Sequence, residues 1–104
     1  MNSEWLTTRE KLFLLLSTSS KPLTSREIMR KLDIRREKEL YEHLNHLALS
    51  LKRTEFTLIV FPPRCANCGY VFSLEKIKKP SRCPKCKSQK IIPPMFLIRS
   101  KKDV

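Results

Sequence analysis

The four cysteines of this 104-residue chain form two Cys-x-x-Cys pairs with fourteen residues between them. Each pair can place two sulfur atoms on one side of a tight turn, and two such turns complete a tetrahedral four-sulfur site. A segment this short has too small an apolar core to fold alone, so a bound ion would have to hold it together. The spacing therefore predicts one metal ion bound by Cys65, Cys68, Cys83 and Cys86.

Zinc is the ion that we expect at this site. In a reducing compartment, paired cysteines are metal ligands more often than disulfides. Four sulfur ligands in a tetrahedron suit zinc, and they also suit the single iron of a rubredoxin. The stretches CANCGYVF and CPKC resemble rubredoxin knuckles, but rubredoxins are typically acidic and rich in core aromatic residues, and this segment is neither. We therefore expect one structural Zn²⁺, with iron as the alternative.

The residues that follow the two cysteine pairs predict a left-handed backbone turn. Gly69 comes directly after the first pair, where such a turn favours a positive φ and brings a backbone N–H to sulfur. Lys87 holds the equivalent place after the second pair. A lysine can adopt this conformation, but only with some backbone strain.

Capping signals and an apolar stripe predict three helices. Residues 7–10 and 24–27 both have the pattern Thr-x-x-Glu, in which the threonine and the glutamate cap each other's backbone N–H groups. They predict helices over about 8–18 and 24–32. Leucines at 40, 44, 47 and 51 share one face of a third helix over about 36–51. On its opposite face we expect i,i+4 ion pairs such as Lys38 with Glu42.

Two β-rich runs follow the helices. We expect antiparallel strands over about 56–61 and 95–99, each bounded by a Pro-Pro pair, and a frayed tail after them. Residues 64–90, which we call the cassette, would then be inserted at the turn of this hairpin. The sequence predicts an α+β fold in which 1–63 and 91–104 form one unit and the cassette forms a metal-binding module.

The order of elements is that of a winged helix-turn-helix, with the third helix as recognition helix and the hairpin as wing. The stretches TSREIMRKL and LYEHLNHL resemble the helix-turn-helix of winged-helix transcriptional regulators, and KPSRCPKC follows in the cassette. Over about residues 8–100, the chain resembles an archaeal family of predicted transcriptional regulators in which a helix-turn-helix is fused to a zinc ribbon. The resemblance implies a winged helix with a rubredoxin-like metal knuckle in its wing, and it implies DNA binding.

The charge of the chain points to a polyanionic partner. The formal net charge is +12, and the cassette carries 8 basic residues and 1 acidic residue. Such a concentration is typical of proteins that bind nucleic acid, here double-stranded DNA. A lysine-rich surface selected for solubility or for life at high temperature is the alternative explanation.

Two groups of residues are candidates for DNA contact. The first lies on the third helix, where the start of a recognition helix meets phosphates and base edges. It comprises Arg35, Arg36, Lys38, Glu42, Asn45 and His46. The second lies in the cassette, in reach of the backbone or the minor groove. It comprises Lys76, Lys78, Lys79, Arg82, Lys85, Lys87 and Lys90.

Other functions remain as alternatives. The glutamates of the third helix favour a protein-interaction module of the archaeal transcription apparatus, and the knuckles leave a rubredoxin-like electron carrier open. We expect no enzyme, because the sequence lacks a nucleophile–base set and four cysteines leave the ion no open position. We expect a cytoplasmic protein without membrane contact, since no signal peptide is evident and the apolar run 12–16 is too short to span a bilayer. Winged helices often form homodimers, and the sequence leaves this open.

Overall fold

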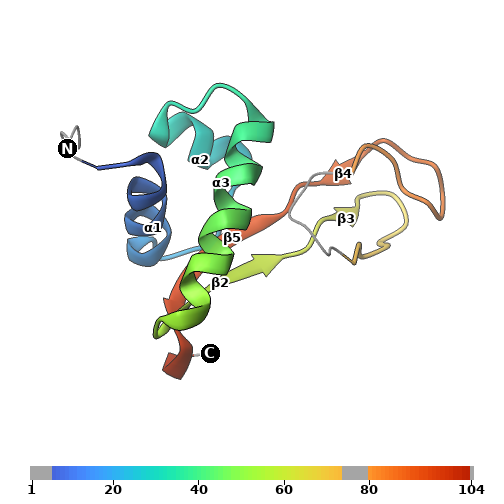
Figure 1. The fold of residues 1–104 in the computed structure, drawn as a ribbon. Helices are drawn as coiled ribbons and strands as arrows, with labels where there is room; N and C mark the ends of the chain where they lie inside the picture. Colours follow the sequence, from blue (N-terminus) through green and yellow to red (C-terminus); the bar gives the residue numbers. More distant parts are fainter. Residues whose placement is uncertain (1–5, 74–79, 104) are drawn as a thin grey trace.

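The computed structural model describes residues 6–73 and 80–103, and it shows an α+β fold with a projecting arm (Figure 1). The described residues form three helices, five strands and two 3₁₀ turns. The elements are α1 (Thr8–Thr18), β1 (Leu23–Thr24), α2 (Ser25–Leu32), α3 (Glu37–Ser50), η1 (Leu51–Arg53), β2 (Phe56–Phe61), β3 (Arg64–Cys65), β4 (Ile91–Ile92), β5 (Met95–Ser100) and η2 (Lys101–Asp103).

Both predicted capping boxes are present. The Thr7 hydroxyl accepts a hydrogen bond from the Glu10 N–H at 3.1 Å, and the Glu10 carboxylate accepts one from the Thr7 N–H at 3.0 Å. Thr24 and Glu27 repeat this arrangement at the start of α2. The backbone hydrogen bond to each carboxylate lowers the pKa of Glu10 and of Glu27, so both stay ionised where helix N-termini favour negative charge.

The helices pack against one face of a three-stranded sheet with the strand order β1-β5-β2. β5 pairs antiparallel with β2 over its whole length, and Leu58 lies opposite Ile98 in this register. The core contains side chains from all three helices and from β5, and those with no exposed surface are Leu12, Leu16, Ile28, Leu40, Leu44, Phe96 and Ile98. β1 is a strand that the sequence analysis did not predict.

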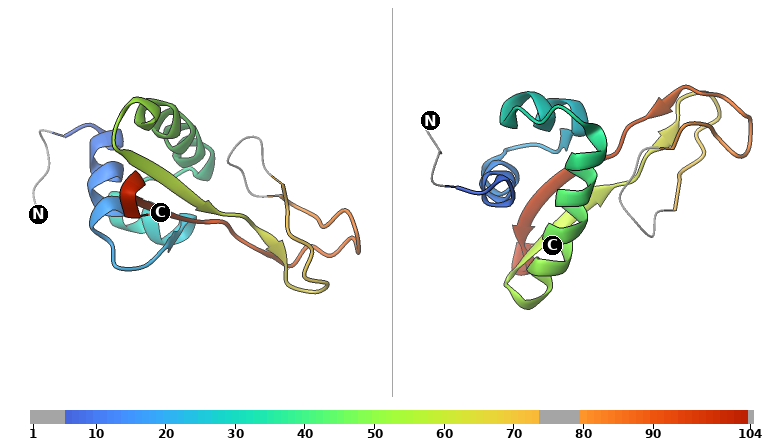
Figure 2. Two further views of the ribbon diagram at one scale, coloured as in Figure 1. Left: turned by 90° about the horizontal axis from the view of Figure 1, so that it is seen from below. Right: turned by 45° about the horizontal axis from the view of Figure 1, so that its top comes forward.

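The hairpin continues past its prolines. The sequence suggested that the strands stop at Pro62-Pro63 and Pro93-Pro94, and β2 and β5 do end there. Pairing then resumes, however, because Arg64 lies opposite Ile92 and Cys65 lies opposite Ile91 in β3 and β4. This second two-stranded segment carries the cassette beyond α3 and away from α1, as both Figure 1 and Figure 2 show.

The expectation of a frayed C-terminal tail was wrong for residues 101–103. They form η2, and the Lys101 ammonium donates hydrogen bonds to the carbonyl oxygens of Thr54 at 2.6 Å and Lys52 at 3.1 Å. A cation at the carbonyl-rich end of a helix is favourable, because the last carbonyl groups have no partners within the helix. These contacts tie the end of the chain to the turn that follows α3.

Arg99 of β5 ties the C-terminal end of α1 to the sheet in the same way. Its guanidinium donates to the carbonyl oxygens of Leu16, Ser17 and Ser19, which lie at the end of α1 and just after it. We expect Arg99→Met to lower the free energy of unfolding by about 2 kcal/mol, since hydrogen bonds to a charged group are lost and carbonyl groups are left without partners. Urea denaturation measures this, with Lys102→Met as the control because Lys102 is exposed. Equal stability of both variants would contradict a capping role for Arg99.

No helix in the described residues is long and apolar enough to cross a membrane.

Candidate metal centre

The four cysteine sulfurs converge within the cassette. All four Sγ atoms lie within 4.8 Å of one another, and the Cys65–Cys86 and Cys68–Cys83 Sγ distances are 3.5 and 3.6 Å. The cysteines are not joined as disulfides. Zinc–sulfur bonds of about 2.3 Å would place the sulfurs of a regular tetrahedron about 3.8 Å apart. The observed arrangement therefore suits a single four-coordinate ion bound by the predicted ligands.

The two Cys-x-x-Cys turns are structural copies of each other. The Gly69 N–H donates to the Cys65 carbonyl at 3.0 Å, and the Lys87 N–H donates to the Cys83 carbonyl at 2.9 Å. The φ angle is +79° at Gly69 and +64° at Lys87, as the sequence predicted for both positions. Lys87 is thus held in a conformation that favours glycine, and the second turn carries backbone strain that the first does not.

This strain gives a testable asymmetry between the turns. We expect Lys87→Gly to tighten zinc binding about fivefold, because it removes left-handed strain of about 1 kcal/mol from a site whose folding depends on the metal. Gly69→Ala should weaken binding by a similar factor. Competition with a chelator measures both changes. Lys87→Ala is the matched control, since it removes the same charge but keeps a Cβ. If Lys87→Ala and Lys87→Gly tighten binding equally, charge and not strain is the cause.

Backbone N–H groups point at the sulfurs. Those of Asn67 and Cys68 donate to Cys65 Sγ at 3.4 Å, and that of Lys85 donates to Cys83 Sγ at 3.4 Å. The Asn67 side chain donates across the site to Cys86 Sγ at 3.5 Å. Such bonds spread the negative charge of bound thiolates and fix their orientation around an ion. The sequence analysis did not single out Asn67, because its role depends on contact with the second turn.

The thiols of Cys68 and Cys86 differ in acidity. The hydrogen bond from the Asn67 side chain and one from the Ser88 backbone lower the pKa of Cys86 to about 6. A backbone hydrogen bond from Tyr70 lowers the pKa of Cys68, but desolvation and the neighbouring thiols together outweigh it and raise this pKa to about 11. Cysteines must lose their protons to bind a metal. Metal binding at neutral pH will therefore release a proton from Cys68. The affinity for the metal will fall on acidification, because protons then compete with the ion for the thiolates.

The cassette has few buried side chains apart from the cysteines. Cys65 and Cys83 are almost fully buried, whereas Cys68 is exposed and Tyr70 is 36% exposed. The Tyr70 and Phe72 rings meet edge to face at 5.1 Å, so these aromatics pack on each other. With so small an apolar core, the described part of the cassette depends on the ion for its fold.

The cassette cations that the sequence analysis selected lie on its surface where they are described. Arg82, Lys85, Lys87 and Lys90 are exposed, and no ion pair is recorded for them within residues 6–73 and 80–103. The other three candidates, Lys76, Lys78 and Lys79, fall outside the described residues. Arg64 was missed: it is exposed on β3 at the base of the cassette and adds a further cation.

The candidates on the third helix lie apart from the cassette (Figure 1). All six of these candidates are among the described residues. The exposed members of the group are Arg35, Arg36, Lys38, Glu42 and His46. Asn45 is half-buried, and its side-chain amide donates to the Tyr41 carbonyl of the same helix at 2.8 Å.

The ion pair expected between Lys38 and Glu42 is not formed. Instead, Glu39 lies 3.8 Å from His43, which completes a pair only when the imidazole is protonated. Glu37 faces α2, where the buried Ser25 hydroxyl donates to its carboxylate at 3.2 Å. Side-chain pairs on α3 are therefore set by its contact with α2 as well as by helix spacing.

Comparison with known families identifies both parts of the chain. Residues 7–59 match the profile described as PF0610-like, N-terminal, and residues 62–101 match the PF0610 rubredoxin-like zinc beta-ribbon domain. The chain belongs to the PF0610-like family. The PF0610-like match covers the three helices and the first part of β2, and the zinc ribbon match covers the cassette with the four cysteines, β4 and β5.

A solved structure supports the same assignment. The solution NMR structure of protein PF0610 from Pyrococcus furiosus is 36% identical to this chain and superposes with a TM-score of 0.77. The similarity covers 97% of this chain and 95% of that one, so it includes the PF0610-like part and the zinc ribbon together. A search of curated proteins gave no match.

Proposed function

We propose that this protein is a DNA-binding transcriptional regulator, in which a winged helix-turn-helix carries a structural zinc site in its wing. α2 and α3 would form the helix-turn-helix, with α3 as the recognition helix, and β2 and β5 would form the wing. The order of helices and the pairing of β2 with β5 support this proposal. The resemblance to winged-helix regulators and the zinc ribbon match are consistent with it.

The observation that carries the proposal is the exposed positive charge on the described part of the cassette. Its described cations are exposed and have no recorded ion pair with other described residues. The chain as a whole has a formal charge of +12, of which four thiolates and a divalent ion would offset 2. A charge excess held on a projecting arm suits the phosphate backbone of a duplex, where binding releases condensed counterions.

The cassette would supply more of the affinity than α3. The exposed cations at the start of α3 share the helix with exposed acidic residues, among them Glu39 and Glu42. Glutamate can accept a hydrogen bond from cytosine, but close to phosphates it weakens non-specific binding. We therefore assign positioning and affinity to the cassette, and base contact to Arg35, Arg36 and Lys38.

Binding to a random-sequence duplex tests the proposal directly. The zinc-loaded protein is titrated into fluorescently labelled DNA at about 50 mM salt, and anisotropy reports the bound fraction. We expect saturable binding in the range of non-specific complexes, a Kd of about 1–100 µM or tighter. No binding at this salt concentration would refute the proposal. The alternative of a module that binds only the transcription apparatus would then be favoured.

A further inference from the structure

The outward side of α1 carries an exposed leucine among polar residues, and no described residue covers it. Residues 12–16 are five consecutive apolar residues, and at 3.6 residues per turn such a run places apolar side chains on every face of a helix. Leu12 and Leu16 are fully buried in the core, whereas Leu14 is 44% exposed. Phe13 and Leu15 are half-buried and pack against the same core, so Leu14 is the apolar residue of this run that faces outward. The exposed side of α1 is therefore a candidate interaction surface.

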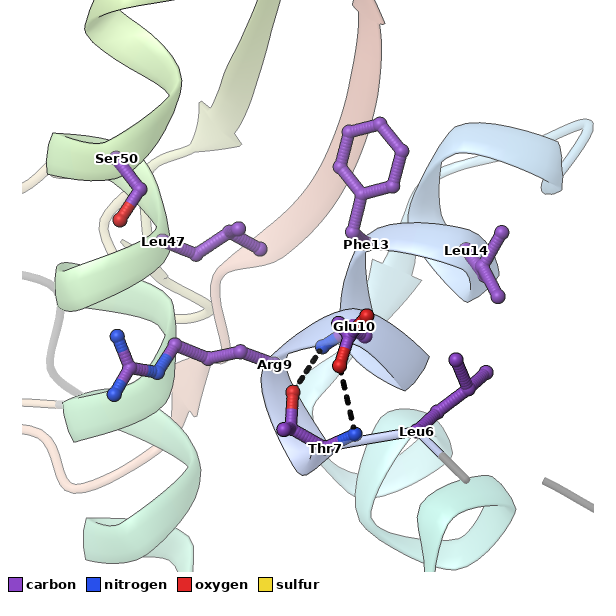
Figure 3. A pocket seen from close by; sticks show the side chains of 8 residues that line it. All are labelled: Leu6, Thr7, Arg9, Glu10, Phe13, Leu14, Leu47 and Ser50. Atoms are coloured by element: carbon purple, nitrogen blue, oxygen red, sulfur yellow. Dashed lines mark hydrogen bonds between the residues drawn. The ribbon is translucent and has the colours of Figure 1, made fainter. Parts of the chain in front are cut away.

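Two hollows flank this side of α1. The larger, of about 580 Å³, is lined by Phe13 of α1 and Leu47 of α3, and by Leu6 and Leu14 (Figure 3). The smaller, of about 380 Å³, lies toward α2 and is lined by Leu32 together with the same Leu6 and Leu14. Leu6 and Leu14 thus form a ridge between two apolar hollows. Alternating ridges and grooves are the surface against which another helix packs.

The rim of these hollows is positively charged. Arg9 lines the larger hollow, and Figure 3 shows its side chain extending from α1 toward α3. Lys11 and Lys31 line the smaller one. None of these three cations makes a recorded ion pair within the described part of the chain. The acidic residue of the rim, Glu10, is already engaged by the Thr7 backbone N–H at 3.0 Å.

We propose that this face of α1 docks an acidic amphipathic helix of a partner protein. Apolar side chains of that helix would enter the two hollows on either side of Leu14, and its carboxylates would meet Arg9, Lys11 and Lys31. Charge complementarity selects this occupant, because an apolar groove with a basic rim favours an apolar helix with acidic flanks. A second copy of the chain would bring the same three cations to the same rim.

The proposed surface is separate from the cassette, to which most of the DNA affinity is assigned. α1 lies on the opposite side of the molecule from the cassette in Figure 1 and in both views of Figure 2. A partner helix on α1 would therefore leave the cassette free, and the two proposals can fail independently.

Amide chemical-shift mapping on the zinc-loaded full chain tests the inference. The probe is a synthetic peptide with leucines at i, i+3, i+4 and i+7 and glutamates at the remaining positions. We expect saturable shifts of amides in residues 6–18 and 28–32. Leu14→Glu should weaken binding on the order of tenfold, and so should the double variant Lys11→Glu with Lys31→Glu. Both changes are at exposed or half-buried positions, so the fold should persist.

Two peptide controls separate this site from simple charge attraction. A peptide of glutamate alone and one with lysines in place of the glutamates should both leave residues 6–18 unshifted. Shifts that are equal for the glutamate-only peptide, or that fall on the cassette, would overturn the proposal. A dimer of the unaltered protein in light scattering, together with a monomer for Leu14→Glu, would also overturn the proposal. A second copy of the chain would then occupy the face. Tighter peptide binding after deletion of residues 1–5 would overturn it as well, because the chain's own N-terminus would be the occupant.

Discussion

Removal of the metal should unfold the cassette and leave the three helices folded. The described cassette buries little besides Cys65 and Cys83, whereas α1, α2, α3 and β5 share a continuous core. Structural zinc sites of this kind contribute about 10 kcal/mol or more of folding free energy, which no apolar contact in the cassette can replace. Metal loss therefore has the largest effect that we expect from any single change.

Amide spectra of the reduced protein with and without a strong chelator measure this effect. Signals from residues 64–73 and 80–92 should collapse toward random-coil positions, while those of residues 8–53 should stay dispersed. Cys83→Ser should give the chelated spectrum even with added zinc, because its sulfur is one of the buried ligands. Persistence of a folded cassette in reduced, metal-free protein would contradict the account. Elemental analysis of protein purified without added metal should find one zinc per chain, and a red protein would indicate iron.

Short-range signals predicted the local structure well. Both Thr-x-x-Glu boxes begin helices, because each box satisfies backbone N–H groups using residues only three apart. The positive φ at Lys87 was predicted from the likeness of the two cysteine turns, since Cys-x-x-Cys geometry fixes the backbone conformation of the residue that follows. The convergence of the four thiols was likewise inferable from spacing alone. These features are encoded within a few residues of chain.

Contacts between distant segments were not predictable in the same way. Arg99 donates to carbonyl groups about 80 residues earlier in the chain, and nothing near it in the sequence signals that partner. β1 is two residues long and exists because β5 lies beside it. The prolines correctly indicated where β2 ends and β5 begins. They did not indicate that pairing resumes beyond them, between Arg64 and Ile92. In each case the tertiary arrangement decides which polar groups find partners.

The exposure of charged side chains was predicted better than their ion pairs. The described cassette cations are on the surface because a module with so little core has nowhere to bury them. The pairing on α3 was misjudged, since Glu37 turns to Ser25 of α2 and Glu39 lies beside His43. Ion pairs at i,i+4 spacing are worth only about 0.5 kcal/mol, so one tertiary contact can redirect them.

The affinity for DNA should fall steeply with salt, and the cassette should account for most of that dependence. Each lysine that neutralises a phosphate contributes about one unit to the slope of log affinity against log salt. Replacement of Lys85, Lys87 and Lys90 by glutamine should therefore reduce the slope by up to about 3. None of the three is a metal ligand, and all are exposed, so the cassette should keep its ion. Their loss should weaken binding on the order of a hundredfold at low salt.

The matched comparison is the triple replacement of Arg35, Arg36 and Lys38 by glutamine, which removes the same charge from the start of α3. The decisive measurement is the anisotropy titration of a random-sequence duplex by both triple variants and the unaltered protein across a salt series. The account predicts that the cassette variant loses more of the salt slope than the α3 variant. An unchanged slope of log affinity against log salt in the cassette variant would contradict the proposal that the cassette binds the phosphates of the duplex.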